Sequence, residues 1–146
     1  MGVSQGMRVA DIGYGTGNVS FGIGSNIGLS GSVCRVDVRK AQLNIAHSQA
    51  ASLNCSNVVF TCASAYDTGL PQESFDLVYC RFFLMHLNQP KDALLEMLSL
   101  VKPGGLIVCE EADISRSFCD PSSSAYERCF ELLLNISDIR GQHFRL

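Results

Sequence analysis

The stretch that decides the fold reads MRVADIGYGTG and occupies residues 7–17. Met7 to Ile12 is apolar enough for a buried strand, and glycine follows at positions 13, 15 and 17. Because glycine has no Cβ, a turn built from it can adopt positive φ and lets a ligand come close to the backbone. We therefore expect a buried strand, a tight turn at 13–17 and a helix over about 18–27.

Beyond this stretch, short apolar runs alternate with helical patterns. Runs typical of strands lie at 32–38, 57–62, 75–80 and 106–110. Helical patterns cover 40–53, 90–101 and about 121–139, and the sequence KPGG at 102–105 predicts a turn before the fifth strand. This alternation implies right-handed crossovers and an α/β fold, a doubly wound parallel sheet of about five strands. At 146 residues the chain fits a single domain, 1–146.

Ligands of such a sheet bind beyond the carboxyl ends of the strands, where the strand order reverses. The turn at 13–17, Asp37, Ser64 and Arg81 all lie at that edge. A carboxylate at Asp37 can accept hydrogen bonds from both ribose hydroxyls of an adenosine ligand. The alternative is a solvated aspartate that caps the next helix. The preceding glycine turn favours the ribose role.

Composition excludes several classes of function. The net charge of −3 comes without a basic cluster, so we expect no nucleic-acid partner. Residues 12–34 carry no charge, but seven of them are glycine, so we expect no membrane span. Seven cysteines without a C-x-x-C pair indicate reduced thiols in a cytoplasmic protein rather than a disulfide or metal site. Those expected in strands, acting as small apolar fillers, are Cys34, Cys62, Cys80 and Cys109.

The glycines follow the spacing G-x-G-x-G, with Asp11 two residues before the first. A dinucleotide fingerprint would need its third glycine at position 18, where the chain has Asn18. Further motifs follow in order: ASA at 63–65, LP at 70–71, SFD at 74–76 and KPGG at 102–105. Over about its first 110 residues, the chain therefore resembles the class I S-adenosylmethionine-dependent methyltransferases, in particular the small-molecule type of ubiquinone and menaquinone biosynthesis.

The resemblance implies S-adenosyl-L-methionine as the cofactor. Asp11 would orient the amino end of its methionine arm, Asp37 would hold the ribose, and Val38 would pack on the adenine. The other residues placed around the cofactor are Gly13, Tyr14, Gly15, Gly17, Ser64, Ala65, Cys80 and Arg81. The family commonly has a carboxylate where this chain has Ser64, and a hydroxyl there would weaken cofactor affinity by about 1 kcal/mol.

Transfer of a methyl group from a reactive sulfonium depends on positioning and water exclusion, so it needs no nucleophile motif. His86 is a candidate general base, with a helix-start or core histidine as the alternative. Residues 79–82 read YCRF and lack the Asn/Asp-Pro-Pro-aromatic tetrapeptide of certain amide and adenine N-methyltransferases. We therefore expect a small organic acceptor, with Phe82, Phe83 and Met85 forming either its wall or part of the core.

The family's sheet ends in an antiparallel strand pair that has no counterpart after residue 110 here. We therefore expect an incomplete methyltransferase domain whose strand 106–110 is an open edge, through which chains can self-associate. Two other functions remain open. One is a methyltransferase-like module that binds the cofactor without turnover. The other is a nicotinamide-dependent oxidoreductase, which Asn18 and the lack of a Tyr-x-x-x-Lys pair disfavour.

Overall fold

The computed structural model describes residues 2–13, 15, 18–41, 46, 48, 50 and 56–142. Its strands are β1 (Arg8–Ile12), β2 (Ser32–Asp37), β3 (Val58–Cys62), β4 (Phe75–Arg81) and β5 (Val101–Glu110). Its α-helices are α1 (Asn18–Ile27), α3 (Pro90–Leu100) and α4 (Ser124–Ile139), and two short 3₁₀ helices are η1 (Leu84–His86) and η2 (Ile114–Arg116). Of the predicted helix 40–53, residues 40, 41, 46, 48 and 50 are helical and the others lie outside the described residues.

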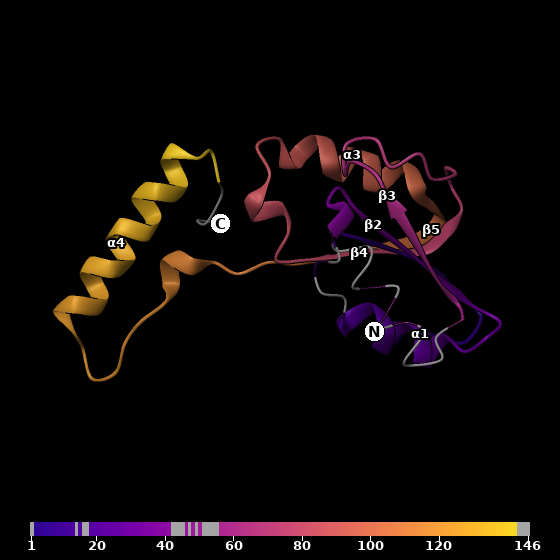
Figure 1. Ribbon diagram of the computed structural model, residues 1–146, viewed down its shortest axis with the longest axis horizontal. Helices are drawn as coiled ribbons and strands as arrows, with labels where there is room; N and C mark the ends of the chain where they lie inside the picture. Colours follow the sequence, from indigo (N-terminus) through magenta and orange to yellow (C-terminus); the bar gives the residue numbers. More distant parts are fainter. Residues whose placement is uncertain are drawn as a thin grey trace.

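The five strands form one parallel sheet in the order β3-β2-β1-β4-β5, which confirms the predicted doubly wound fold. The chain runs outward from β1 to β3 and then returns to the other side of β1 for β4. In Figure 1, α1 covers one face of the sheet and α3 covers the other. The order reverses between β1 and β4, so a crevice opens at their carboxyl ends.

Each face of the sheet has its own apolar core, because neighbouring side chains of a strand point to opposite faces. On the α3 face the core comprises Ala10, Ile12, Val36, Val78, Cys80, Ala93, Met97 and Leu100. On the α1 face it comprises Val9, Val33, Leu77, Tyr79, Phe21, Ile23 and Ile27. Arg35 is fully buried on the α1 face, with its guanidinium 4.8 Å from the ring centre of Phe21 and 5.1 Å from that of Phe60.

The segment at 102–105 differs from the prediction. We expected a turn before a strand at 106–110, but β5 already begins at Val101. Phe75 pairs with Val101 and Leu77 pairs with Leu106, so residues 102–105 bulge out of the ladder. Lys102 Nζ lies 2.6 Å from Asp76 Oδ1 and ties the bulge to the neighbouring strand. Regular pairing resumes at Leu106, where the strand was predicted to begin, because Gly104 and Gly105 lie in the bulge.

The cysteine prediction holds for Cys80, which is buried, but is wrong for Cys62 and Cys109, which are exposed. Cys62 is the last residue of β3 and Cys109 the last but one of β5, and these are the two outer strands of the sheet. All six cysteines in the described part of the chain have free thiols.

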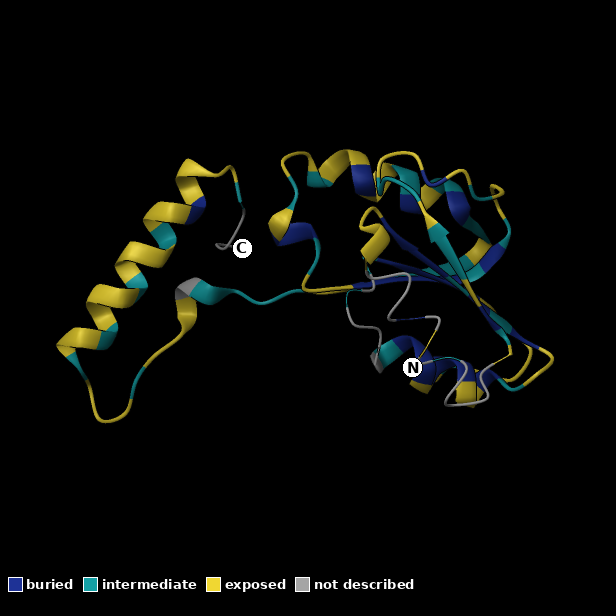
Figure 2. Ribbon diagram, viewed as in Figure 1, coloured by how far each residue is buried: buried dark blue, intermediate teal, exposed yellow. Residues whose placement is uncertain are grey.

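Helix α4 lies apart from the sheet, beyond an extended segment that follows β5 (Figure 1). It begins at Ser124 rather than at Pro121, because the Ser123 side chain accepts a hydrogen bond from Tyr126 N and acts as the N-cap. Of its sixteen residues, all of them described, Ser137 alone is buried, and Figure 2 shows the helix mostly exposed. No helix within the described ranges is long and apolar enough to cross a membrane.

Candidate functional site

A cavity of about 860 Å³ opens where the carboxyl ends of β1, β2 and β4 meet. The structure brings most of the predicted binding residues into its wall: Asp11, Gly13, Gly15, Asp37, Val38, Ser64, Ala65 and Arg81. His86 also lines it. The predicted contacts Tyr14 and Gly17 lie outside the described residues.

Cys80 is the predicted contact that does not reach the cavity. Its side chain is fully buried in the core on the α3 face, because position 80 points to the opposite face of β4 from Tyr79 and Arg81. Tyr79, which the motifs did not identify, lines the cavity in its place.

The glycine turn is shaped by a neighbouring ring. Gly13 has φ +73° and donates from its N–H to the carbonyl of Val36 at 2.8 Å. A Cβ added at Gly13 would lie 2.1 Å from the Phe83 ring. Gly15 has φ +52°, but no described atom lies within 4 Å of its added Cβ. The backbone at Gly13 is therefore covered by Phe83, whereas none of the described residues covers Gly15.

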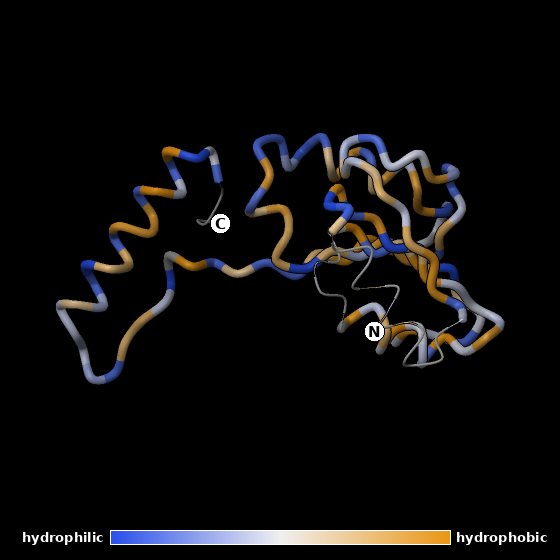
Figure 3. The backbone as a smooth tube through the Cα atoms, in the orientation of Figure 1, coloured by the Kyte–Doolittle hydropathy of each residue, from blue (hydrophilic) through white to orange (hydrophobic). Residues whose placement is uncertain are grey.

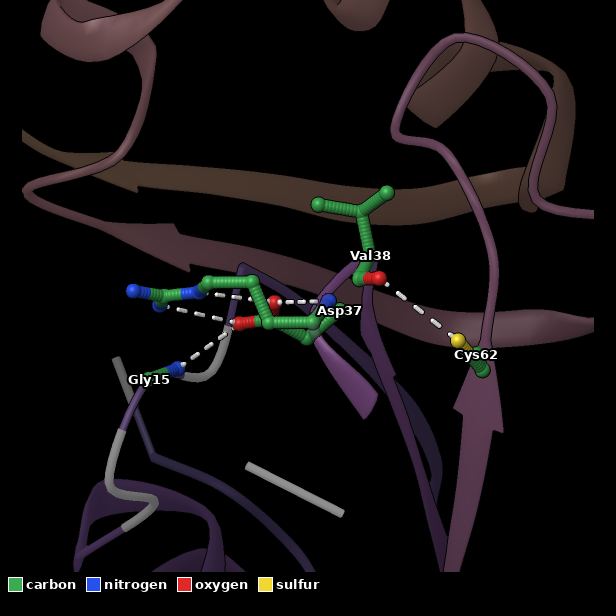
Figure 4. Close-up of polar contacts among 5 residues, drawn as sticks. Gly15, Asp37, Val38 and Cys62 are labelled. Atoms are coloured by element: carbon green, nitrogen blue, oxygen red, sulfur yellow. Dashed lines mark hydrogen bonds and ion pairs between the residues drawn. The ribbon is translucent and has the colours of Figure 1, made fainter. Parts of the chain in front are cut away.

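Asp37 lies at the end of β2, with only 5% of its side chain exposed. Its Oδ2 accepts from Gly15 N at 3.3 Å, which ties the glycine turn to the neighbouring strand. Its Oδ1 accepts from Arg39 N at 2.9 Å in a tight turn just before the helical residues 40–41. Figure 4 shows these contacts converging on the carboxylate. The bond from Arg39 N is a local backbone contact before the next helix, as expected of a capping aspartate, but the side chain is buried rather than solvated. The carboxylate also lines the cavity.

Asp11 is a buried acid in the cavity wall, with 3% of the residue exposed. The Ser20 hydroxyl of α1 donates to Asp11 Oδ2, and Arg35 is its register partner on β2. Burial raises the pKa of Asp11 from 3.8 to about 6, although the Ser20 hydrogen bond and the Arg35 charge both act to lower it. A cation bound in the cavity would therefore stabilise the ionised form of this carboxylate.

Next to Val38, the cavity wall is formed by Ser64 and Tyr66, which follow β3 in the chain. Val38 is largely exposed, at 69% of the residue. The Ser64 hydroxyl accepts from Tyr66 N at 3.2 Å and lies in a turn closed by a bridge between Ser64 and Asp67. Tyr66 lines the cavity as well, which no motif had indicated.

Glu110, the last residue of β5, contacts two cavity residues near the end of β4. Tyr79 Oη donates to Glu110 Oε2 at 2.9 Å, and Arg81 Nε lies 3.3 Å from the same oxygen. Burial, together with this hydrogen bond, raises the pKa of Tyr79, so its phenol stays protonated. From the sequence, Glu110 was only the last residue of the predicted strand 106–110, and no motif indicated its contacts with Tyr79 and Arg81.

The loop after β4 is fixed by Glu111. Its Oε1 accepts from the N–H groups of Phe83 and Leu84 at 3.0 and 2.9 Å, and its Oε2 accepts from Met85 N at 3.4 Å. The backbone of Phe82 has φ +47°, a strained value for a bulky residue. His86 is exposed at the end of the loop, with Nδ1 3.5 Å from Gln142 Nε2. The loop thus presents Phe83 and His86 to the cavity.

Of the three residues considered for the acceptor wall, Phe82 and Phe83 line the cavity and Met85 does not. Met85 is buried, which supports its packing in the core, whereas Phe82 and Phe83 line the cavity. No cluster of metal-ligating side chains occurs in the described part of the chain. The site therefore offers carboxylates, backbone N–H groups and aromatic rings, which suit a polar ligand with an aromatic base.

Comparisons with known proteins agree with this geometry. The family model described as "Methyltransferase domain" matches residues 10–109. The ubiquinone/menaquinone biosynthesis C-methyltransferase UbiE of Pseudomonas savastanoi pv. phaseolicola is 33% identical over 135 residues, which is 91% of this chain and 53% of the relative. The chain thus spans about half the length of the curated relatives that it matches.

Two solved structures resemble the fold. A SAM dependent methyltransferase from Aquifex aeolicus superposes with a TM-score of 0.73 and 24% identity, covering 93% of this chain and 73% of that one. CrArsM, an arsenic (III) S-adenosylmethionine methyltransferase from Chlamydomonas reinhardtii, gives a TM-score of 0.67 and 29% identity, covering 73% of this chain and 39% of that one.

The family match runs from within β1 into β5 and so includes the glycine turn, Asp37 and the ends of β1, β2 and β4 that line the cavity. The cofactor of that family is S-adenosyl-L-methionine. This chain belongs to the S-adenosylmethionine-dependent methyltransferases, through the Methyltransferase domain family.

Proposed function

We propose that the protein transfers a methyl group from S-adenosyl-L-methionine to a small organic acceptor, and that this chain provides the cofactor-binding half. One observation carries the proposal. Two carboxylates on neighbouring strands, Asp11 and Asp37, line one cavity on either side of a glycine turn. The name of the UbiE relative, a C-methyltransferase of quinone biosynthesis, supports a small-molecule acceptor. The free thiols fit a cytoplasmic location.

The cavity wall suits the adenosine part of the cofactor. Asp37 would accept from the ribose hydroxyls, and the exposed face of Val38 would pack on the adenine. Ser64 and Ala65 would border the base, with Ser64 accepting from its amino group. The open space over Gly15 leaves room for a ligand against the backbone.

The opposite end of the cavity suits the methionine arm. Asp11 would face its ammonium group, while Gly13 lines the floor and Arg81 the side. A cation near Asp11 would lower the raised pKa of this carboxyl, so binding and ionisation would support each other. Cys80 would contribute through its backbone only, since its side chain is buried.

When bound, S-adenosylmethionine supplies a methyl group on an electrophilic sulfonium. The residues of this chain would orient that ligand and exclude water, which accounts for much of the acceleration in an in-line transfer. Phe82 and Phe83 would form an apolar wall toward the acceptor. His86 would serve as a general base where the acceptor must lose a proton.

The test is ligand binding by the purified chain. We expect S-adenosylhomocysteine to raise the melting temperature and NAD to leave it unchanged, because an adenosine without a pyrophosphate fits the G-x-G-x-G turn. Asp37→Ala is expected to weaken this binding by about 1.5–3 kcal/mol, the range for hydrogen bonds to a charged group, and Asp37→Asn by less. Equal stabilisation by NAD would contradict the proposal.

A second candidate function follows from how much of the relatives this chain covers. The chain spans about half the length of its curated relatives, and the second candidate function is a module that binds the cofactor without catalysing transfer. Methyl-transfer assays on the chain alone and on a longer protein that contains it would separate the two functions. Binding without turnover in both proteins would favour a non-catalytic module.

A further inference from the structure

The carboxylate proposed to hold the ribose already has a full set of donors. Two come from the backbone: Gly15 N to Oδ2 at 3.3 Å and Arg39 N to Oδ1 at 2.9 Å. Two come from the Arg39 side chain: Nε to Oδ1 at 3.2 Å and Nη2 to Oδ2 at 3.4 Å. A carboxylate offers about four acceptor positions, so a ribose diol needs two of these donors to leave.

The two backbone donors are part of the fold. Gly15 N belongs to the glycine turn, and Arg39 N belongs to the turn that leads into helical residues 40–41. Releasing either would move the main chain. The Arg39 side chain is different, because 60% of it is exposed, and a rotation of its own torsions can withdraw it.

The side-chain bonds are also long for hydrogen bonds between two charged groups. Charge-assisted N–H···O bonds have typical lengths of about 2.7–2.9 Å. Those of the Arg39 guanidinium, at 3.2 and 3.4 Å, are longer. Water can solvate the released guanidinium, since Arg39 lies on the cavity rim. Ribose hydroxyls can therefore replace Arg39 on Asp37 without any change in the backbone.

We infer that the Arg39 side chain occupies the Asp37 carboxylate in the free protein and is displaced from it by the ribose of the cofactor. The inference rests on the proposed function, because it takes the ligand to be an adenosine with a free diol. Binding then requires an ion pair to break. That requirement lowers the affinity and makes it depend on ionic strength, because the exposed guanidinium of Arg39 leaves this ion pair open to screening by salt.

The experiment is calorimetric titration with S-adenosylhomocysteine, which has no net charge at neutral pH and so undergoes little electrostatic steering. Three proteins are compared: the wild type, Arg39→Ala and Lys40→Ala. Lys40→Ala is the matched control, because it removes the same charge from the next, exposed residue. Each protein is titrated at about 0.1 M and about 1 M sodium chloride, where the Debye length is about 10 Å and about 3 Å.

We expect Arg39→Ala to bind about two- to fivefold more tightly than the wild type at low salt, the effect of removing one exposed ion pair. High salt is expected to tighten binding by the wild type and by Lys40→Ala, but to leave Arg39→Ala nearly unchanged. Equal or weaker binding by Arg39→Ala, with the wild type binding normally, would overturn the inference alone. No binding by any of the three proteins would overturn the proposed function and this inference together.

Discussion

Gly13 has two physical reasons to be glycine, one in its backbone conformation and one in the packing around it. Its φ of +73° is a conformation that side chains rarely adopt, and the Phe83 ring occupies the place of its Cβ. Gly15 shares the positive φ, at +52°, but has open space where its Cβ would be. Comparing substitutions at Gly13 and Gly15 therefore distinguishes the cost of backbone strain, which both share, from the cost of steric overlap, which only Gly13 has.

We predict that Gly13→Ala destabilises the fold more than Gly15→Ala. Each change costs about 1–2 kcal/mol for the left-handed backbone. Overlap with the Phe83 ring adds about 1–3 kcal/mol for Gly13→Ala alone. Urea denaturation of both variants measures the difference, and the double variant Gly13→Ala with Phe83→Ala would remove the overlap. Equal losses in the two single variants would mean that Phe83 does not press on the turn.

Asp11 predicts a pH dependence of cofactor binding. Burial raises its pKa from 3.8 to about 6, so the neutral form stabilises the fold below about pH 4, and this stabilisation is lost as the pH rises through 6. An ammonium group of the ligand needs the ionised form. Affinity for S-adenosylhomocysteine is therefore expected to fall about tenfold from pH 7 to pH 5, since one pH unit below its pKa only about a tenth of an acid is ionised.

The matched variant for this pH dependence is Asp11→Asn, which keeps an oxygen for the Ser20 hydroxyl. We expect it to bind more weakly than the wild type at pH 7 and to show a flat profile between pH 5 and 7. Calorimetric titrations at several pH values measure both. A wild-type affinity that does not change over this range would contradict the role of Asp11.

At the scale of elements, the end of β5 organises the loop that follows β4. Glu111, the residue just after β5, accepts hydrogen bonds from Phe83, Leu84 and Met85 and so holds η1 in place. The same loop carries Phe83, which covers the glycine turn after β1. Three strand ends are thereby connected through one carboxylate and one ring.

We predict that Glu111→Ala lowers the free energy of unfolding by about 1–3 kcal/mol, because it leaves backbone donors without their acceptor. Glu111→Gln keeps one acceptor oxygen and is expected to lose less. Glu127→Ala, on the exposed surface of α4, is the control. Urea denaturation gives the stability, and hydrogen exchange at residues 83–85 gives the local effect. Unchanged exchange in Glu111→Ala would show that the loop is held by other contacts.

At the scale of the whole molecule, two apolar surfaces lack cover. One is the outer strand β5, with a groove of about 270 Å³ beside it that Leu106 and Val108 help to line. The other is α4, whose Leu132, Ile136 and Ile139 are exposed. In Figure 3, apolar and polar residues alternate along α4, as in a helix that packs one face against a partner.

We predict that the isolated chain self-associates through one of these surfaces. Light scattering over a range of concentrations measures the association. Val108→Lys is expected to reduce it if the β5 edge is responsible, and Ile136→Lys if α4 is. A monomer at high concentration, with slowly exchanging amides in β5, would show that the edge is protected.

The sequence by itself determined that the chain alternates strands and helices, where most of the strands lie, and at which edge of the sheet ligands bind. Those properties follow from short-range features: the period of the apolar residues, the glycines after β1 and the position of Asp37 twenty residues after Gly17. The predicted β1 and β4 agree with the structure to within a residue at each end.

Only the tertiary structure decided which side chains face one another across the site. Phe83 covers a glycine seventy residues earlier, Glu111 holds η1 from another strand, and Arg39 folds back on Asp37. The exposure of Cys62, the burial of Cys80 away from the cavity and the exposure of nearly all of α4 were equally undetermined. Such contacts depend on how the crossovers pack and on which rotamers the packing leaves open, and no local pattern in the sequence encodes them.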